Sequence, residues 1–227
     1  MVQAIAPAGS LSNFPFMTSP EFCDAAEALC RRVHAVGGPH KLDWWSVRLQ
    51  QESSRPILKI SKNIASLGSS IPRGNHLPPD TPEQDEPLED RLKDDDTEAL
   101  VRTSNPDPLR VEYDIILSPT YRVPVLYFLL RNIPSEGPTG IDAVYQYLVP
   151  HHYRSPLGSV GIMGGYHPES GIPVYFVHPC DTANAMRGIV GQETIGTETY
   201  LFIWLGLVGN CVNLHLPSRL LADSDMG

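Results

Sequence analysis

The chain has 227 residues, 41% of them hydrophobic, with 17 basic and 26 acidic side chains and a formal charge of −9. The segment from Asp80 to Asp107 holds 11 acidic residues against three basic ones, a net of −8, so only −1 remains for the rest. We therefore expect one folded domain over residues 1–227 and exclude a broad basic face for nucleic acid.

A helix is predicted first. Ser19-Pro20-Glu21 has the order of an N-cap, a proline in the first turn and an early acid, and Gly37-Gly38-Pro39 ends the run. Apolar residues recur between them at helical spacing, namely Phe22, Ala26, Leu29 and Val33. Cys23 and Cys30 lie seven residues apart on this face, so we expect both to be buried structural cysteines.

Two strands are predicted next, from Trp44 to Leu49 and from Ile57 to Ile60, joined by a polar turn. The composition then changes, because the stretch from Ser61 to Pro108 contains seven prolines, an acidic run and no aromatic residue. Such a stretch cannot bury enough apolar surface to become ordered. We predict a flexible acidic insertion over about 61–108, either a passive spacer or a docking segment for a basic partner.

Two β-rich runs follow the insertion, Tyr113 to Ser118 and Tyr121 to Leu130. The short Pro119-Thr120 link between them predicts a tight hairpin, and Pro124 assigns part of the second run to an edge or a bulge. A short amphipathic helix is expected from Gly140 to Leu148, and an irregular Gly- and Pro-rich loop from Pro150 to Gly171.

The C-terminal part predicts a strand from Ile172 to Val177, helices over Thr182–Val190 and Thr199–Val208, and a short strand from Val212 to Leu216. A frayed tail over residues 218–227 closes the chain. This order favours an α+β fold, with one antiparallel sheet and flanking helices.

The four cysteines are too few and too scattered for a disulfide scaffold, and no CxxC pair supports a zinc site. The N-terminus has no basic leader and is broken by proline, which argues against a signal peptide. The longest apolar run, Leu201 to Val208, is far shorter than the roughly 20 residues of a membrane span. We expect a soluble protein of a reducing compartment, without stable membrane insertion.

Cys180 differs from the other cysteines in its setting. It follows a proline that ends a strand and precedes a helical segment, whose backbone N–H groups favour a thiolate, whereas the adjacent Asp181 opposes it. His178, two residues upstream in extended chain, is expected on the same face. From spacing alone, a nucleophilic and a buried structural Cys180 both stay open, and His178 suits a support of the loop better than a base.

Four motifs occur in order along the chain: YRVPVLYF from Tyr121, VHPC from Val177, WLGLVG from Trp204 and LHLP from Leu214. Together they resemble the autophagy-related protein ten family of E2-like enzymes, from about Phe22 to Pro217 without the acidic insertion. The sister family, autophagy-related protein three, shares the His-Pro-Cys triplet and carries an acidic flexible insertion. The YRVPVLYF stretch, the region from LVGN to LHLP and the modest length favour the first family, while the insertion keeps the second open.

The resemblance implies an E2 (UBC)-like fold and a thioester relay in the cytoplasm, without cofactor or metal. Cys180 matches the family's catalytic cysteine. It would accept the C-terminal glycine of the ubiquitin-like autophagy-related protein twelve from the E1-like autophagy-related protein seven. A lysine of autophagy-related protein five would then take the modifier, which supports autophagosome formation. The sister family would instead pass the lipid-linked modifier to phosphatidylethanolamine.

The second transfer needs a donor for the developing oxyanion. Ordinary E2 enzymes use the asparagine of a His-Pro-Asn triplet, but this triplet ends in Cys180. His178 and Tyr121 are the candidate donors, Tyr121 because it is expected at the head of the strand before the active loop. Asn184 is a further option, although it suits a plain exposed helix position better.

Two other classes of protein are alternatives for this sequence. A thiol hydrolase would pair Cys180 with His151, His152 or His167, but no protease signature surrounds the cysteine. A noncatalytic binding module would use the sheet edge near Tyr121 to capture a partner by strand addition. No metal site is expected at His151-His152, because adjacent strand residues face opposite ways and no further ligand lies at suitable spacing.

Overall fold

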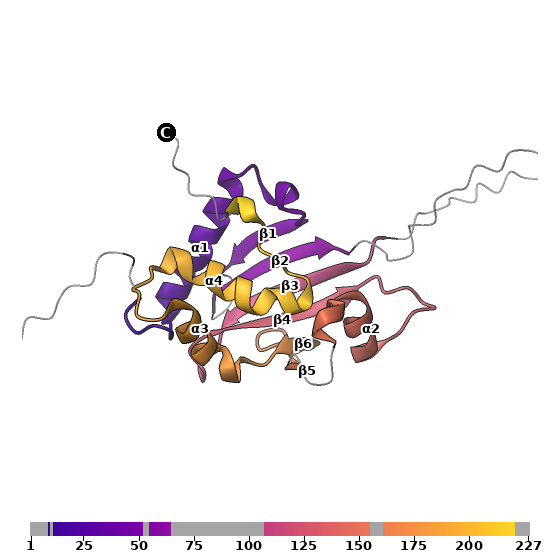
Figure 1. The fold of residues 1–227 in the computed structure, drawn as a ribbon. Coiled ribbons are helices and arrows are strands. Elements are labelled where there is room, and N and C mark those ends of the chain that lie inside the picture. The colour runs from indigo at the N-terminus through magenta and orange to yellow at the C-terminus, as the bar shows by residue number, and fades with distance from the viewer. Residues whose placement is uncertain (1–8, 10, 52–54, 65–106, 155–160, 221–227) are drawn as a thin grey trace, which may run out of the picture. The chain divides into compact units, whose positions relative to one another are not determined.

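A computed structural model of the chain describes residues 9, 11–51, 55–64, 107–154 and 161–220 (Figure 1). Within them, one antiparallel sheet has the strand order β1-β2-β3-β4-β6-β5. The strands are β1 Ser46–Gln50, β2 Ile57–Asn63, β3 Arg110–Leu117, β4 Pro124–Arg131, β5 Ile162–Tyr166 and β6 Pro173–Val177. The α-helices of the described part are α1 Ser19–Ala35, α2 Gly140–Tyr147, α3 Thr182–Val190 and α4 Thr197–Val208. The predicted antiparallel sheet with flanking helices is confirmed.

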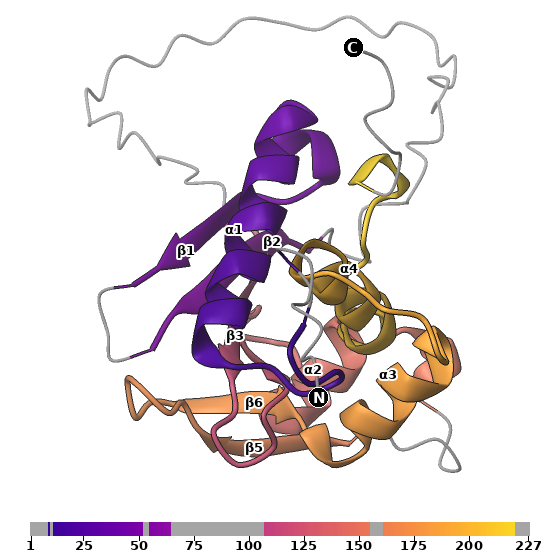
Figure 2. The ribbon, with the colours of Figure 1, turned by 90° about the vertical axis from the view of Figure 1, so that its left-hand side faces the viewer.

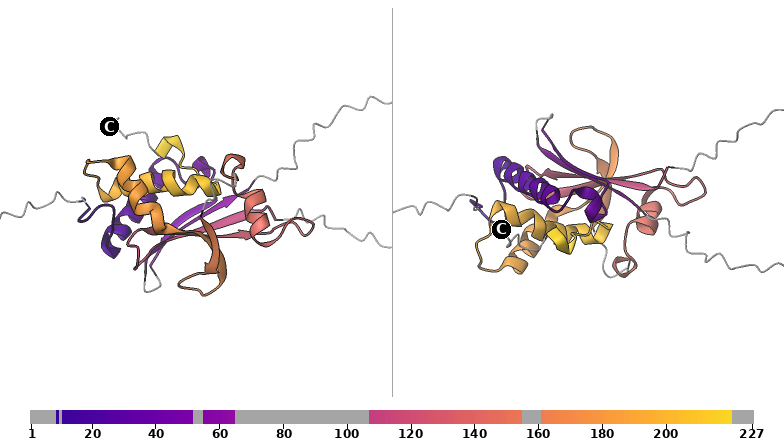
Figure 3. Two further views of the ribbon diagram at one scale, coloured as in Figure 1. Left: turned by 60° about the horizontal axis from the view of Figure 1, so that its bottom comes forward. Right: turned by 90° about the horizontal axis from the view of Figure 1, so that it is seen from above.

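Helices α1 and α4 pack against each other on one side of the sheet (Figure 3). The chain enters α1 through a capping box, in which Thr18 rather than the expected Ser19 is the N-cap: its backbone N–H donates to Glu21 Oε2 at 2.7 Å. Phe22 and Leu29 of α1 and Trp204 of α4 are fully buried in the core between helices and sheet. No helix among the described residues combines the length and the apolar character needed to cross a membrane.

Strands β2 and β3 lie side by side although the insertion separates them in the chain. They pair from Ile57 opposite Ile116 to Asn63 opposite Arg110, and the Ile64 N–H donates to the Leu109 carbonyl at 2.8 Å. β2 therefore continues to Asn63, three residues beyond the predicted strand end at Ile60 and into the range of about 61–108 predicted for the insertion. Its middle, residues 65–106, lies outside the described residues.

The predicted hairpin at Pro119-Thr120 is a longer loop than expected. β3 ends at Leu117 and β4 begins at Pro124, so residues 118–123 form the connection and Tyr121 lies in a turn, not at the head of a strand. The Ser118 N–H donates to the Val123 carbonyl at 3.0 Å and closes this loop. Arg122 has a φ of 55°, which no strand residue adopts, and this interrupts the β-like pattern.

Pro124 does not place β4 at an edge. β4 is an interior strand between β3 and β6, and its ladder with β6 is limited to Tyr127 opposite Phe176 and Phe128 opposite Tyr175. Pro124 is its first residue, beyond that ladder, where the missing N–H removes no hydrogen bond to β6.

Two predictions in the C-terminal half are wrong. The expected irregular loop from Pro150 to Gly171 contains β5, which the pattern hid because Gly164 and Gly165 disfavour strands in isolation. A Cβ at Gly165 would lie 3.0 Å from the Phe176 ring, so glycine leaves room there for the aromatic side chain of β6. The expected strand from Val212 to Leu216 is a 3-10 helix, η4 Gly209–Val212, and a turn that reverses at Asn213 with a φ of 57°.

Candidate active site around Cys180

Cys180 lies at the corner between β6 and α3. It is exposed and occupies the middle of the 3-10 helix η3, Pro179–Asp181, whose first residue is buried. The His178 N–H donates to the Gly161 carbonyl at 2.8 Å, which joins the end of β6 to the start of β5. The proline corner followed by a helix is what the sequence predicted, and it presents the thiol to solvent.

The imidazole of His178 turns back onto this corner. Its Nδ1 accepts a hydrogen bond from the Cys180 N–H at 3.3 Å, so His178 caps η3. Because Nδ1 is the acceptor, a neutral ring carries its proton on Nε2, and that nitrogen is then a donor. This geometry suits a loop support and a hydrogen-bond donor, and it leaves Nε2 unsuited to the role of a base.

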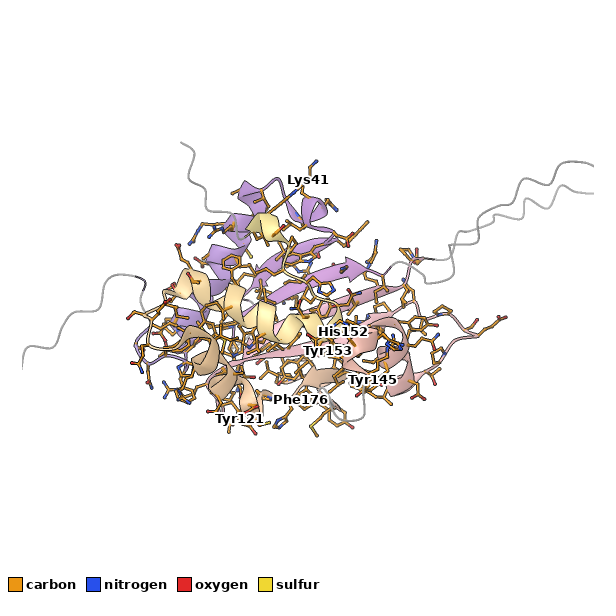
Figure 4. All side chains as sticks on the ribbon, in the orientation of Figure 1. Lys41, Tyr121, Tyr145, His152, Tyr153 and Phe176 are labelled. Atoms are coloured by element: carbon orange, nitrogen blue, oxygen red, sulfur yellow. The ribbon has the colours of Figure 1, made fainter. Side chains whose placement is uncertain are left out.

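Tyr121 reaches the same corner from the loop of residues 118–123. Its ring meets that of His178 edge to face, with centroids 5.7 Å apart, and 41% of the residue is exposed. The ring of Phe176 also lies against His178, at 6.3 Å. Figure 4 labels Tyr121 and Phe176, which both lie along the lower edge of the molecule in that view. The structure thus brings together the two predicted donors from different elements.

Within the turn that carries Tyr121, Ser118 accepts two hydrogen bonds, one on its hydroxyl and one on its carbonyl. The Tyr121 N–H donates to Ser118 Oγ at 3.2 Å, and the Arg122 N–H donates to the Ser118 carbonyl at 2.8 Å. The β-rich run around Tyr121 predicts a strand, whereas the local signal for a turn is Ser118, whose hydroxyl commonly closes turns of this kind.

Asn184 is exposed on α3, one helical turn after Cys180. Its Oδ1 accepts a hydrogen bond from Arg187 Nη1 at 3.3 Å. This is the plain exposed helix position that its sequence context favoured.

The histidines considered for a thiol hydrolase have other partners. His167 is 5% exposed; its Nδ1 accepts from the N–H groups of Glu169 and Ser170, and its Nε2 lies 3.1 Å from Asp114 Oδ2. His151 and His152 are exposed in the 3-10 helix η2, His151–Tyr153, and the His152 ring contacts Tyr153. Within the described ranges, no three histidine, cysteine or acidic side chains gather as metal ligands would.

The other three cysteines differ from Cys180 in burial. Burial raises the pKa of the Cys211 thiol to about 12, and its Sγ donates to the Val208 carbonyl. Burial also raises the pKa of Cys30, which packs against the core. The expectation that Cys23 and Cys30 are both buried is wrong, because each is half-buried. Cys23 lies at the margin of the α1 face, where Gln51 Nε2 donates to its Sγ at 3.2 Å. Partial burial, with Glu27 and Asp24 nearby, raises its pKa too.

Comparison with known proteins shows which family the chain resembles. The model of the family described as "Autophagocytosis associated protein, active-site domain" matches residues 21–219. The "Ubiquitin-like-conjugating enzyme ATG10" of Gibberella zeae is 32% identical, over 93% of this chain and 98% of that protein. "Autophagy-related protein 3" of Vanderwaltozyma polyspora is 28% identical, over 60% of this chain and 42% of its own length. "Solution structures of KmAtg10" aligns with 17% identity and a TM-score of 0.43, over 88% of this chain and 97% of that one.

These matches define an E2-like transferase that conjugates a ubiquitin-like modifier in autophagy. The chain belongs to the family of autophagocytosis-associated proteins with this active-site domain, and within it to the ATG10 enzymes. The sister family is the weaker match, and the hydrolase and the noncatalytic module are set aside because the relatives are conjugating enzymes.

Proposed function

We propose that the enzyme accepts autophagy-related protein twelve as a thioester on Cys180 from the E1-like autophagy-related protein seven. It then transfers the modifier to a lysine of autophagy-related protein five, in the cytoplasm. The observation that supports Cys180 most strongly is that it is an exposed thiol on a proline corner, whereas burial raises the pKa of the other three cysteines.

Loading is a transthioesterification, in which the acyl group passes from the E1 cysteine to Cys180. The Cys180 thiolate attacks the carbonyl carbon of the modifier's C-terminal glycine, a new C–S bond forms, and the C–S bond to the E1 cysteine breaks. The E1 thiolate leaves and takes a proton from solvent. The thioester on Cys180 keeps the reactivity of the acyl group for the amine that follows.

Transfer needs stabilisation of a negative oxygen. A neutral target lysine attacks the thioester carbonyl, the N–C bond forms, and a tetrahedral oxyanion develops. The added nitrogen then loses a proton to solvent, the C–S bond breaks, and the Cys180 thiolate departs. The Tyr121 hydroxyl and His178 Nε2–H are the donors that we assign to this oxyanion. Two observations support this assignment: the edge-to-face contact of the Tyr121 and His178 rings at 5.7 Å, and the hydrogen bond that the Cys180 N–H donates to His178 Nδ1.

The experiment combines the purified chain with the E1-like enzyme, ATP and one of two modifiers. With autophagy-related protein twelve we expect an adduct that a thiol reductant removes. With the lipid-linked modifier we expect no adduct. A reducible adduct with the lipid-linked modifier alone would overturn the proposed substrate and favour transfer to phosphatidylethanolamine. Adding autophagy-related protein five to the loaded enzyme, and measuring transfer of the modifier to it, then tests the target.

A further inference from the structure

The segment from Leu11 to Met17, just before α1, lies against both elements that frame the cysteine corner. The Met17 N–H donates to the Arg122 carbonyl at 2.8 Å, next to Tyr121 in the turn. The Phe16 ring contacts two guanidinium groups, Arg122 at 5.6 Å and Arg187 of α3 at 5.2 Å. Phe16 therefore bridges the loop that carries Tyr121 and the helix that follows Cys180.

This segment is itself firmly held. The buried Tyr200 hydroxyl of α4 donates to the Pro15 carbonyl at 2.7 Å, and the Phe14 ring packs edge-on against Tyr200. The Phe16 N–H donates to the Asn13 carbonyl at 2.8 Å, and Met17 is 1% exposed. Figure 2 shows this indigo stretch before α1 on the side of the molecule where α3 lies. The segment that carries Phe16 is therefore anchored to buried residues of the core.

The turn beside it needs such support. Arg122 holds a φ of 55°, a left-handed conformation that costs free energy in a residue with a Cβ and persists only where contacts hold it. The Arg122 carbonyl accepts a hydrogen bond from the Met17 N–H. The Arg122 guanidinium lies over the Phe16 ring, in a cation–π contact within the usual distance of about 6 Å. Tyr121 is the neighbouring residue, so the position of its ring against His178 depends on the conformation of this turn.

We propose that Phe16 is a positioning residue for the transfer step: through Arg122 it holds the turn in the conformation that keeps Tyr121 against His178. Its second contact, with Arg187, connects that turn to α3, so that the turn and α3 keep a fixed position relative to each other on the two sides of the corner. The inference rests on the proposed role of Tyr121 as an oxyanion donor. Phe16 acts through Tyr121 and does not touch the reacting atoms.

The test is single-turnover transfer from a preformed thioester to a saturating target. Phe16→Leu fills the space without an aromatic face, and we expect transfer about fivefold to tenfold slower, the size of effect that a lost cation–π contact of this kind can have. Phe16→Tyr keeps the ring and should stay within about twofold of the natural chain. Loading by the E1-like enzyme should change by less than about twofold in both variants, since loading needs no donor from Tyr121.

A matched control removes a similar contact elsewhere. The Trp45 ring lies under Arg110 at 4.8 Å, at the opposite end of β3 from the loop of residues 118–123. Trp45→Leu should leave transfer unchanged. A double-mutant cycle with Tyr121→Ala completes the test, because Phe16→Leu should add less than about twofold once Tyr121 is gone.

The outcomes separate the two claims. If Tyr121→Ala slows transfer but Phe16→Leu does not, or if both slow it additively, the inference is wrong while the donor role stands. Equal slowing of loading and transfer by Phe16→Leu, with a lower melting temperature, would also overturn the inference, because Phe16 would then support only the fold. Normal transfer by Tyr121→Ala would overturn the donor role itself.

Discussion

The rings of Tyr121 and His178 meet edge to face at 5.7 Å, although Tyr121 lies in the loop between β3 and β4 and His178 directly follows β6, more than 50 residues later in the chain. Cys180 follows within two residues of His178 and gives its N–H to that ring. The contact therefore couples the loop of residues 118–123 directly to the backbone of the cysteine corner.

The Tyr121→Phe variant distinguishes the contribution of the hydroxyl from that of the ring. The variant keeps the ring contact with His178 but removes the donor, so we expect transfer from a preformed thioester to slow by about 10- to 100-fold, somewhat less than an enclosed oxyanion site loses. Tyr121→Ala should slow transfer further and should still slow it more than loading. Single-turnover gels measure both steps. Tyr166→Phe, at a tyrosine of β5 that is 75% exposed, is the control, and equal slowing of loading and transfer would indicate a damaged fold.

Cys180→Ser keeps the shape of the corner and exchanges the nucleophile. With the E1-like enzyme, ATP and modifier, we expect either no adduct or one that resists reductant and yields to alkali, because serine forms an ester. Serine at Cys23, Cys30 or Cys211 should leave the reducible adduct intact. A reductant-sensitive adduct on the Cys180→Ser chain would show that another thiol carries the modifier.

The free energy of unfolding should fall in alkaline solution, and part of this fall should come from ionisation of the Cys211 thiol. Its pKa is about 12 in the folded chain against an ordinary 9.0, so the folded state binds this proton more tightly. The resulting stabilisation is complete below pH 9 and is lost as the pH rises from about 9 to 12, at up to about 1.4 kcal/mol per pH unit. Denaturant unfolding at pH 8 and pH 10 measures the loss, and Cys211→Ala should lose about 1 kcal/mol less over this interval. An identical loss in both chains would contradict this assignment.

Removing the acidic insertion should leave the fold intact. We expect replacement of residues from Gly74 to Asp107 by a short Gly/Ser linker to change the melting temperature little, because the closure entropy of a loop grows slowly with length. The ladder from Ile57 to Asn63 with β3 and the Ile64 to Leu109 hydrogen bond hold the two strand ends together without the insertion. Thermal unfolding measures the change. A fall of more than about 8 °C, which corresponds to several kcal/mol in a domain of this size, would indicate that the insertion packs on the core.

Helices and the cysteine corner could be predicted because their signals are local. The apolar spacing of Phe22, Leu29 and Val33 marks one face of α1 wherever that helix packs, and Pro179 begins η3 two residues after β6 ends. The sequence alone therefore determined the α+β class, the approximate position of each α-helix and the candidacy of Cys180.

The rest depended on partners distant in the chain. Gly164 and Gly165 form a strand only because β6 pairs with them and lays the ring of Phe176 against Gly165. Tyr121 faces His178 because Arg122 takes a left-handed conformation, which Met17 and Phe16 hold from the other end of the chain. Neither contact leaves a periodic pattern, since each is a single meeting of side chains and backbone. Only the tertiary structure could decide which residues surround the cysteine.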